Sequence, residues 1–266
     1  MSRELVLSER PIIIGMVHLR PTLGAPYPEK ISSMVGKAVE DAMALEKGGV
    51  DAVLVENFFD FPYYPNRVPP ETIASITVAV LEVMRSVSVP VGVNILRNDS
   101  LASLAVAQAT GASFIRVNVL TDAYVTDQGI IEGKAHELLR ARSRLEDICG
   151  KIKILADVRV KHASPLSTRP MVEEALDAYE RGGADAIVIT GSRTGVPPTE
   201  DSLMKLRRAL KDVPIFLGSG VNPKNVSLLR YADGAIVGSY FKEGGISSPV
   251  SVEKVKSLVE AVRSLK

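Results

Sequence analysis

Ionisable side chains lie at the C-terminal ends of short segments rich in Val and Ile. Glu56 and Asp157 end two such segments, and Lys161 lies a few residues beyond the second. These three residues are the best candidates for proton transfer, because a carboxyl or amino group exchanges protons efficiently once its surroundings tune its pKa. His18 ends another segment and is a fourth catalytic candidate, with a structural, hydrogen-bonded histidine as the alternative.

Amide and guanidinium side chains occupy similar positions and are candidates for substrate binding. Asn94 ends one apolar segment, and Arg116 and Asn118 end the next. Asparagine orients hydroxyl groups without titrating, and arginine stabilises negative charge that develops on a substrate. A buried ion pair of Arg116 with Asp157 or Glu56 is the alternative interpretation. No local motif with metal-ligand spacing, such as H-E-x-x-H, is present, so we expect neither a metal ion nor another cofactor.

Two glycine-containing turns near the end of the chain are typical of a phosphate site. Gly218-Ser219-Gly220 follows the apolar segment Ile215–Leu217, and Gly238-Ser239 follows Ala235–Val237. Glycine lets the backbone approach a ligand, and adjacent N–H groups together with serine hydroxyls bind anions. A short helix beginning near Tyr240 would add its positive end. The alternative is that the glycines only allow tight turns.

A third turn of this kind begins at Thr190-Gly191 and continues through Ser192, Arg193 and Thr194 to Gly195. Its hydroxyl groups and glycines predict a contact with the phosphate or with the group next to it. A flexible loop that binds nothing is the alternative.

The apolar segments that carry these residues alternate with longer amphipathic segments along the chain. Short runs of Val and Ile are typical of parallel strands that are buried on both faces. The eight predicted strands are Ile12–Val17, Ala52–Val55, Val91–Ile95, Phe114–Val117, Ile152–Val158, Ala186–Ile189, Ile215–Leu217 and Ala235–Val237. The predicted helices are Ile31–Lys47, Thr72–Arg85, Ser100–Ala109, Lys134–Asp147, Met171–Glu180, Asp201–Leu210 and Val252–Leu265. A (β/α)8 barrel typically needs about 250 residues, so we expect one such domain over residues 1–266.

Two kinds of short sequence motif precede the predicted strands, and they alternate along the chain. Motifs such as Gly48-Gly49-Val50-Asp51 and Gly182-Gly183-Ala184-Asp185 precede even-numbered strands. Val89-Pro90 and Val213-Pro214 precede odd-numbered ones. Four copies of a repeat that contains two βα units close naturally into an eight-stranded TIM barrel. A doubly wound open sheet is the alternative, and it is disfavoured because no G-x-G-x-x-G follows the first strand.

Bulk composition argues against several classes of function. Lys and Arg number 32 against 31 Asp and Glu, a net charge of +1, so we expect neither nucleic acid nor an anionic membrane as partner. The single cysteine, Cys149, excludes an internal disulfide and a multi-cysteine metal site. The longest apolar runs have the length of strands, which predicts no transmembrane segment. The first residues do not resemble a signal peptide, so we expect a cytoplasmic protein.

Aromatic residues are concentrated in one predicted loop. Phe58, Phe59, Phe61, Tyr63 and Tyr64 lie close together, and nearby prolines keep the segment non-helical. Apolar rings that an isolated barrel leaves partly exposed predict a subunit contact, and hence a homo-oligomer. A loop packed against its own barrel is the alternative.

These residues lie in motifs that resemble the BtpA family, which is named for a photosystem I biogenesis factor and grouped with ribulose-phosphate-binding barrels. The matching motifs are Gly15-Met16-Val17-His18-Leu19, Glu56-Asn57-Phe58, Gly92–Asp99, Phe114–Asn118, Thr126–Gly129, Lys161-His162-Ala163, Thr190-Gly191 with Thr194-Gly195, Gly218-Ser219-Gly220 and Ile236–Ser239. The similarity runs in order over nearly the whole chain. It implies a barrel with a phosphate pocket. It also suggests photosystem assembly and peripheral membrane association, which the residues themselves do not indicate.

The candidate residues predict an enzyme that binds a phosphorylated small molecule and performs isomerase or lyase chemistry. In this hypothesis the two C-terminal glycine turns hold the phosphate, and Asp157 and Glu56 exchange protons with the substrate. Lys161 and Arg116 stabilise the negative charge that develops there. The alternative is a non-catalytic assembly or regulatory factor that retains the barrel and uses the aromatic loop as its partner surface.

Overall fold

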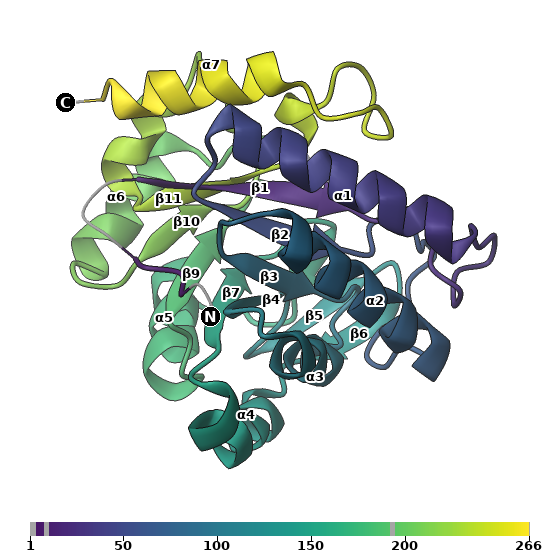
Figure 1. Cartoon of the computed structure of the whole chain (residues 1–266). Helices are drawn as coiled ribbons and strands as arrows, with labels where there is room; N and C mark the ends of the chain where they lie inside the picture. The colour runs from purple at the N-terminus through teal and green to yellow at the C-terminus, as the bar shows by residue number, and fades with distance from the viewer. Residues whose placement is uncertain (1–3, 8–10, 192–194, 266) are drawn as a thin grey trace.

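Eight parallel strands close into a barrel in the computed structural model, which describes residues 4–7, 11–191 and 195–265 (Figure 1). Around the barrel the order is β1, β2, β3, β4, β7, β9, β10 and β11, and β11 pairs with β1. These strands are β1 (Ile12–His18), β2 (Ala52–Glu56), β3 (Val91–Asn94), β4 (Phe114–Val117), β7 (Lys153–Val158), β9 (Ala186–Ile189), β10 (Ile215–Leu217) and β11 (Gly234–Val237). Each coincides with one of the apolar runs, and the predicted (β/α)8 barrel is confirmed.

Helices surround the barrel, and α7 lies alongside α1 so that the ends of the ring meet (Figure 1). The α-helices are α1 (Ile31–Gly48), α2 (Pro70–Ser86), α3 (Ser100–Thr110), α4 (Ala135–Cys149), α5 (Met171–Leu176), α6 (Glu200–Ala209) and α7 (Val252–Arg263). A π-helical turn, η1 (Asp177–Arg181), continues α5. The connection from β10 to β11 contains the 3-10 helix η2 (Val226–Tyr231) in place of an α-helix. The short helix expected near Tyr240 is a single 3-10 turn, η3 (Ser239–Phe241), too short to provide a substantial helix dipole.

Alternate residues of the barrel strands point into the barrel and form a core of their own. Phe114, Leu155 and Phe216 fill this interior and are fully buried. Gly92 leaves room for the Phe114 ring, because a Cβ at Gly92 would lie 2.2 Å from that ring. Side chains two residues further along each strand therefore lie one layer higher, at the C-terminal mouth. The candidate site residues at the strand ends follow the same alternation of inward-facing and outward-facing side chains.

A three-stranded antiparallel sheet, which the sequence did not predict, adjoins the mouth. It contains β5 (Ala123–Thr126), β6 (Gly129–Glu132) and β8 (Ala163–Pro165), in the order β6, β5, β8. The first two strands form a hairpin in the long connection after β4, and the third lies in the connection after β7. The sheet thus joins two loops that carry candidate site residues.

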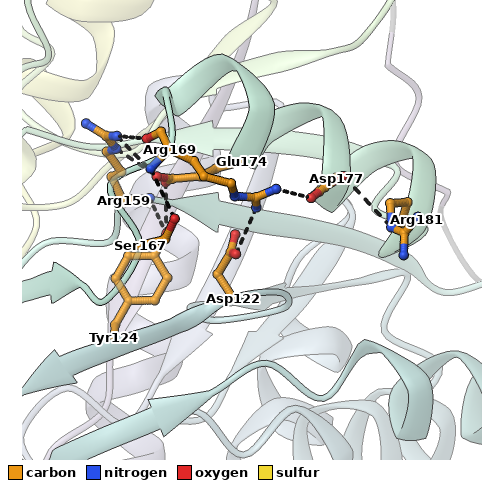
Figure 2. A network of polar contacts seen from close by, with 8 residues as sticks. All are labelled: Asp122, Tyr124, Arg159, Ser167, Arg169, Glu174, Asp177 and Arg181. Atoms are coloured by element: carbon orange, nitrogen blue, oxygen red, sulfur yellow. Dashed lines mark hydrogen bonds and ion pairs between the residues drawn. The ribbon is translucent and has the colours of Figure 1, made fainter.

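A network of polar contacts fixes this sheet against α5 and the end of β7 (Figure 2). Arg159 donates to Glu174 at 3.1 Å, and the Tyr124 hydroxyl donates to the same carboxylate at 3.3 Å. The Tyr124 hydroxyl also accepts a bond of 3.2 Å from the Arg159 backbone N–H. Arg169 adds an ion pair of 2.9 Å with Asp122, just before β5. The turn that follows β7 is therefore fixed by α5, through Glu174, and by β5, through Tyr124.

The aromatic loop between β2 and α2 is partly packed and partly exposed. The Phe58 ring lies 4.5 Å from the His18 ring, and the Tyr63 hydroxyl donates to the Phe58 carbonyl at 2.6 Å. Phe61 and Tyr64 are 58% and 50% exposed. The homo-oligomer remains a prediction: light scattering should give a mass at least twice 28.6 kDa. A monomer over a wide range of concentrations would contradict it.

Candidate functional site

Two adjoining cavities lie at the C-terminal mouth of the barrel. One, which we call the glycine-turn cavity, has a volume of about 440 Å³, including space open to solvent. Four candidates for proton transfer or charge stabilisation line it, namely His18, Glu56, Arg116 and Lys161, whereas Asp157 does not. Both C-terminal glycine turns also line it, through Gly218, Ser219, Gly220, Gly238 and Ser239. The structure therefore brings most of the predicted site residues to one place.

Arg116 and Asp157 form a buried, bidentate ion pair. Arg116 Nε and Nη2 each donate to one Asp157 oxygen at 2.9 Å, and Asn118 donates to the same carboxylate at 3.0 Å. The two charged side chains are only 3% and 0% exposed. Burial alone would lower the pKa of Arg116, but the Asp157 carboxylate raises it above its ordinary value. Asp157 is thus on the interior side of β7, bound to Arg116, and lines neither cavity.

Lys161 reaches the cavity because the chain turns inward after β7. Arg159 and His162 adopt left-handed backbone conformations, with φ of 53° and 57°. In the described part of the chain, the Lys161 ammonium has no hydrogen bond or ion pair with another side chain. Burial lowers the pKa of Lys161, and the positive charge of Arg116 lowers it further. An ammonium with a lowered pKa is a stronger acid and is a suitable proton donor.

Glu56 lines both cavities and has the opposite pKa shift. Burial raises the pKa of Glu56, although Arg116 and Lys161 oppose the change. A carboxylate with a raised pKa is a stronger base than a free glutamate. Glu56 and Lys161 therefore form a base and an acid that face the same space.

His18 is neutral in this environment. Burial lowers the pKa of His18 to about 3, and the charges of Lys242, Lys161 and Arg116 contribute in the same direction. Its Nε2 lies 3.9 Å from Glu56 Oε1, and its buried Nδ1 has no hydrogen-bond partner among the described residues. A neutral imidazole at this position can donate or accept one hydrogen bond, but it supplies no positive charge.

The glycine turns line the same cavity with closely packed backbone. Gly220 has a φ of 74°, and a Cβ there would lie 2.3 Å from the Pro197 nitrogen. A Cβ on Gly238 would lie 2.9 Å from the His18 ring. Within the described residues, the backbone N–H groups of Gly220 and Ser239 have no protein acceptor. Free N–H groups beside glycines form a suitable cradle for an anion.

Three other predicted binding residues support the site without lining it. Asn94 donates to the Arg116 carbonyl at 3.0 Å, and Thr190 donates to the Arg159 carbonyl at 3.3 Å. The Gly191 N–H donates to the Ser219 hydroxyl, which itself donates to the Val196 carbonyl. That hydroxyl is therefore occupied, and only the backbone of Ser219 is left to face a ligand. Residues 192–194 of this turn lie outside the described residues.

The second cavity, which we call the aromatic cavity, contains residues that the sequence did not single out. It has a volume of about 730 Å³, including open space, and shares Glu56, Phe58, Arg116 and Lys161 with the first. Its other lining residues are Phe61, Tyr63, Leu96, Arg97, Asn118, Asp127 and His162. Two signals point to Arg97. It lies within the family motif Gly92–Asp99, and it lies three residues beyond the end of β3, as Lys161 does beyond β7.

The described residues contain neither a helix that could span a membrane nor a cluster of metal ligands. No helix there has the length and apolar character needed to cross a membrane. No group of three or more His, Cys, Asp or Glu side chains in those ranges is arranged to hold a metal ion.

The profile of the BtpA family matches residues 8–264. The chain belongs to the BtpA family. This BtpA-family protein is 47% identical to an uncharacterised protein of Pyrococcus abyssi over 98% of both chains. It is also 43% identical to the photosystem I biogenesis protein BtpA of Synechocystis, over 94% of this chain and 87% of that protein. The family resemblance predicted from the motifs is confirmed.

Solved structures of other families share the architecture of this BtpA-family barrel. The N-(5'-phosphoribosyl)anthranilate isomerase of Pyrococcus furiosus is similar with a TM-score of 0.59 and 14% identity, and the match covers 96% of this chain and 100% of that chain. At this identity the likeness shows a common TIM-barrel fold and does not show a common activity.

Proposed function

We propose that this BtpA-family protein is an enzyme that binds a phosphorylated small metabolite and performs acid–base chemistry of the isomerase or lyase type. The observation that carries the proposal is the composition of the glycine-turn cavity. The cavity is lined by Gly220 and Ser239, whose backbone N–H groups have no acceptor among the described residues, together with Glu56, Lys161 and the paired Arg116. Enzymes of this fold commonly bind phosphate at the turns after the last two strands.

In the proposed reaction Glu56 and Lys161 act on opposite sides of a carbonyl group. The Glu56 carboxylate removes a proton from the carbon beside the carbonyl, and the Lys161 ammonium donates a proton to the carbonyl oxygen. When the carbon that loses the proton carries a hydroxyl group, the product of this step is an enediol. Isomerisation is complete when Glu56 returns its proton to the former carbonyl carbon and the neutral Lys161 amine accepts the proton of the other hydroxyl group. Arg116 provides a fixed positive charge near the developing oxyanion, and Asp157 positions Arg116. Asp157 transfers no proton directly in this scheme, because its carboxylate is bound to Arg116 and lines neither cavity.

The names of similar proteins support two different proposals. The phosphoribosylanthranilate isomerase that shares the fold acts, by its name, on a phosphoribosyl compound, which agrees with a phosphate site here. The Synechocystis relative is named as a photosystem I biogenesis protein. That name favours the second candidate, a non-catalytic assembly factor that uses the exposed aromatic loop as its partner surface.

A thermal-shift screen with sugar phosphates and inorganic phosphate distinguishes these candidates. The proposed enzyme should be stabilised by about 2.7 kcal/mol at a ligand concentration about 100 times the Kd. A Ser239→Asp variant should lose this stabilisation, because an added carboxylate at this exposed cavity residue repels the phosphate. The matched control is Ser227→Asp, at an exposed serine of η2 that lines neither cavity, which should retain it. Absence of stabilisation by every phosphorylated compound would contradict the enzyme proposal.

A further inference from the structure

The aromatic cavity is a continuation of the glycine-turn cavity. Glu56, Phe58, Arg116 and Lys161 line both, so a ligand whose phosphate contacts the glycine turns has its other end at these four residues. Beyond them the character of the walls changes from glycine backbone to aromatic rings and unused hydrogen-bond donors. The size and chemistry of this second space therefore indicate what is attached to the phosphorylated part of the ligand.

Aromatic rings from a single loop form one wall of the aromatic cavity. Phe58 is fixed by its ring contacts with His18 and with Phe59, whose centroid lies 5.3 Å away. Tyr63 is tied to the Phe58 carbonyl. Phe61 lines the cavity yet is 58% exposed, which leaves an apolar face without a partner. Rings presented in this way favour a flat ligand group that stacks on them.

Hydrogen-bond donors that the protein does not use lie at the edge of the same cavity. Arg97 is only 6% exposed, and within the described residues its guanidinium donates a single hydrogen bond, to the Lys161 carbonyl at 2.7 Å. Neither Arg97 nor Lys161 forms an ion pair in the described part of the chain. A buried guanidinium with unused N–H groups requires acceptors, because an unsatisfied donor is costly. The edge of the ligand group must therefore carry oxygen acceptors.

We propose that the aromatic cavity binds a planar ring with carbonyl oxygens, joined to the sugar phosphate that the glycine turns hold. The substrate class is then a pyrimidine-nucleotide-like compound whose sugar part carries the reacting carbonyl, with its ring stacked at Phe61 and the carbonyl edge of the ring at Arg97. Lys161, which lines both cavities, stays with the sugar part on which it acts. This inference rests on the proposed function, because the two cavities share one ligand and the glycine turns bind its phosphate.

Calorimetric titration with ribose phosphate and with uridine monophosphate tests the ring site. Uridine monophosphate should bind at least tenfold more tightly than ribose phosphate. Phe61→Ala should weaken its binding about tenfold, the expected effect of losing one stacking partner, and should leave the affinity for ribose phosphate unchanged. Tyr64→Ala is the matched control, because Tyr64 belongs to the same loop and is similarly exposed but does not line the cavity. This variant should bind both compounds as the natural chain does.

The outcomes separate the ring site from the phosphate site. Equal affinities for the two compounds, or an equal loss of both in Phe61→Ala, would overturn the ring site while the phosphate site stands. A loss of uridine monophosphate binding in Tyr64→Ala as large as in Phe61→Ala would also overturn it, because the effect would then belong to the loop as a whole. Failure of both compounds, of inorganic phosphate and of every sugar phosphate in the thermal-shift screen to bind would overturn the proposed function itself.

Discussion

Replacing Asp157 with alanine is expected to destabilise the barrel by about 3–5 kcal/mol, because it leaves the Arg116 guanidinium buried without a counter-charge. Arg116 is 3% exposed and donates two hydrogen bonds to that carboxylate, so water cannot replace the lost partner. Equilibrium unfolding in urea measures the effect. Glu82→Ala is a suitable control, because Glu82 pairs with Arg85 on the surface, and an exposed pair contributes at most about 1 kcal/mol.

A double variant separates the effect of the two charges on stability from the effect of side-chain size. Arg116→Met combined with Asp157→Leu removes both charges and keeps side chains of similar size, so its stability should be close to that of the natural chain. Ligand binding should weaken in the same protein, since Arg116 lines both cavities. If the free energy of unfolding of Asp157→Ala is within about 1 kcal/mol of that of the natural chain, the ion pair contributes no more than an exposed pair would. That result would contradict the buried pairing described above.

Replacing Lys161 with methionine is expected to lower kcat/KM by about 100- to 1,000-fold for the substrate that the thermal-shift screen identifies. Methionine has a similar length but neither donates a proton nor carries a charge. The control is Lys153→Met, because Lys153 begins β7 at the opposite end of the barrel and pairs with Glu4. This variant should retain full activity, since Lys153 lines neither cavity.

The pH dependence of kcat/KM tests the roles of the two groups. With Glu56 as base and Lys161 as acid, both must be ionised in the free enzyme. Activity should therefore rise with pH through the pKa of Glu56, which burial raises, and fall through that of Lys161, which burial lowers. Lys161→Met should remove the fall at high pH, and Glu56→Gln should remove the rise at low pH. A residual activity with an unchanged bell-shaped profile in either variant would contradict the assignment.

The positions of the barrel strands followed from local sequence alone. Runs such as Ala186–Ile189 and Phe114–Val117 are rich in β-branched and aromatic residues and occur at regular spacing. Each is a strand with the bounds that the sequence predicts. Parity along a strand also placed Asp157 on the same side as Leu155, because successive residues point to opposite faces. The sheet of β5, β6 and β8 was not predicted, since its strands are short and Thr126 pairs with Ala163, far away in the sequence.

By itself, the sequence determined which residues stand at the ends of parallel strands, and in a closed barrel those ends meet at one mouth. This is why Glu56, Lys161 and the glycine turns could be predicted as neighbours. Only the tertiary structure decided how the charges pair. Asp157 binds Arg116 and is withdrawn from the cavity, while Arg97 and Lys161 retain donors that no other described residue accepts. Distances of a few ångströms and burial set those pairings and pKa shifts, and neither is encoded in a local pattern of residues.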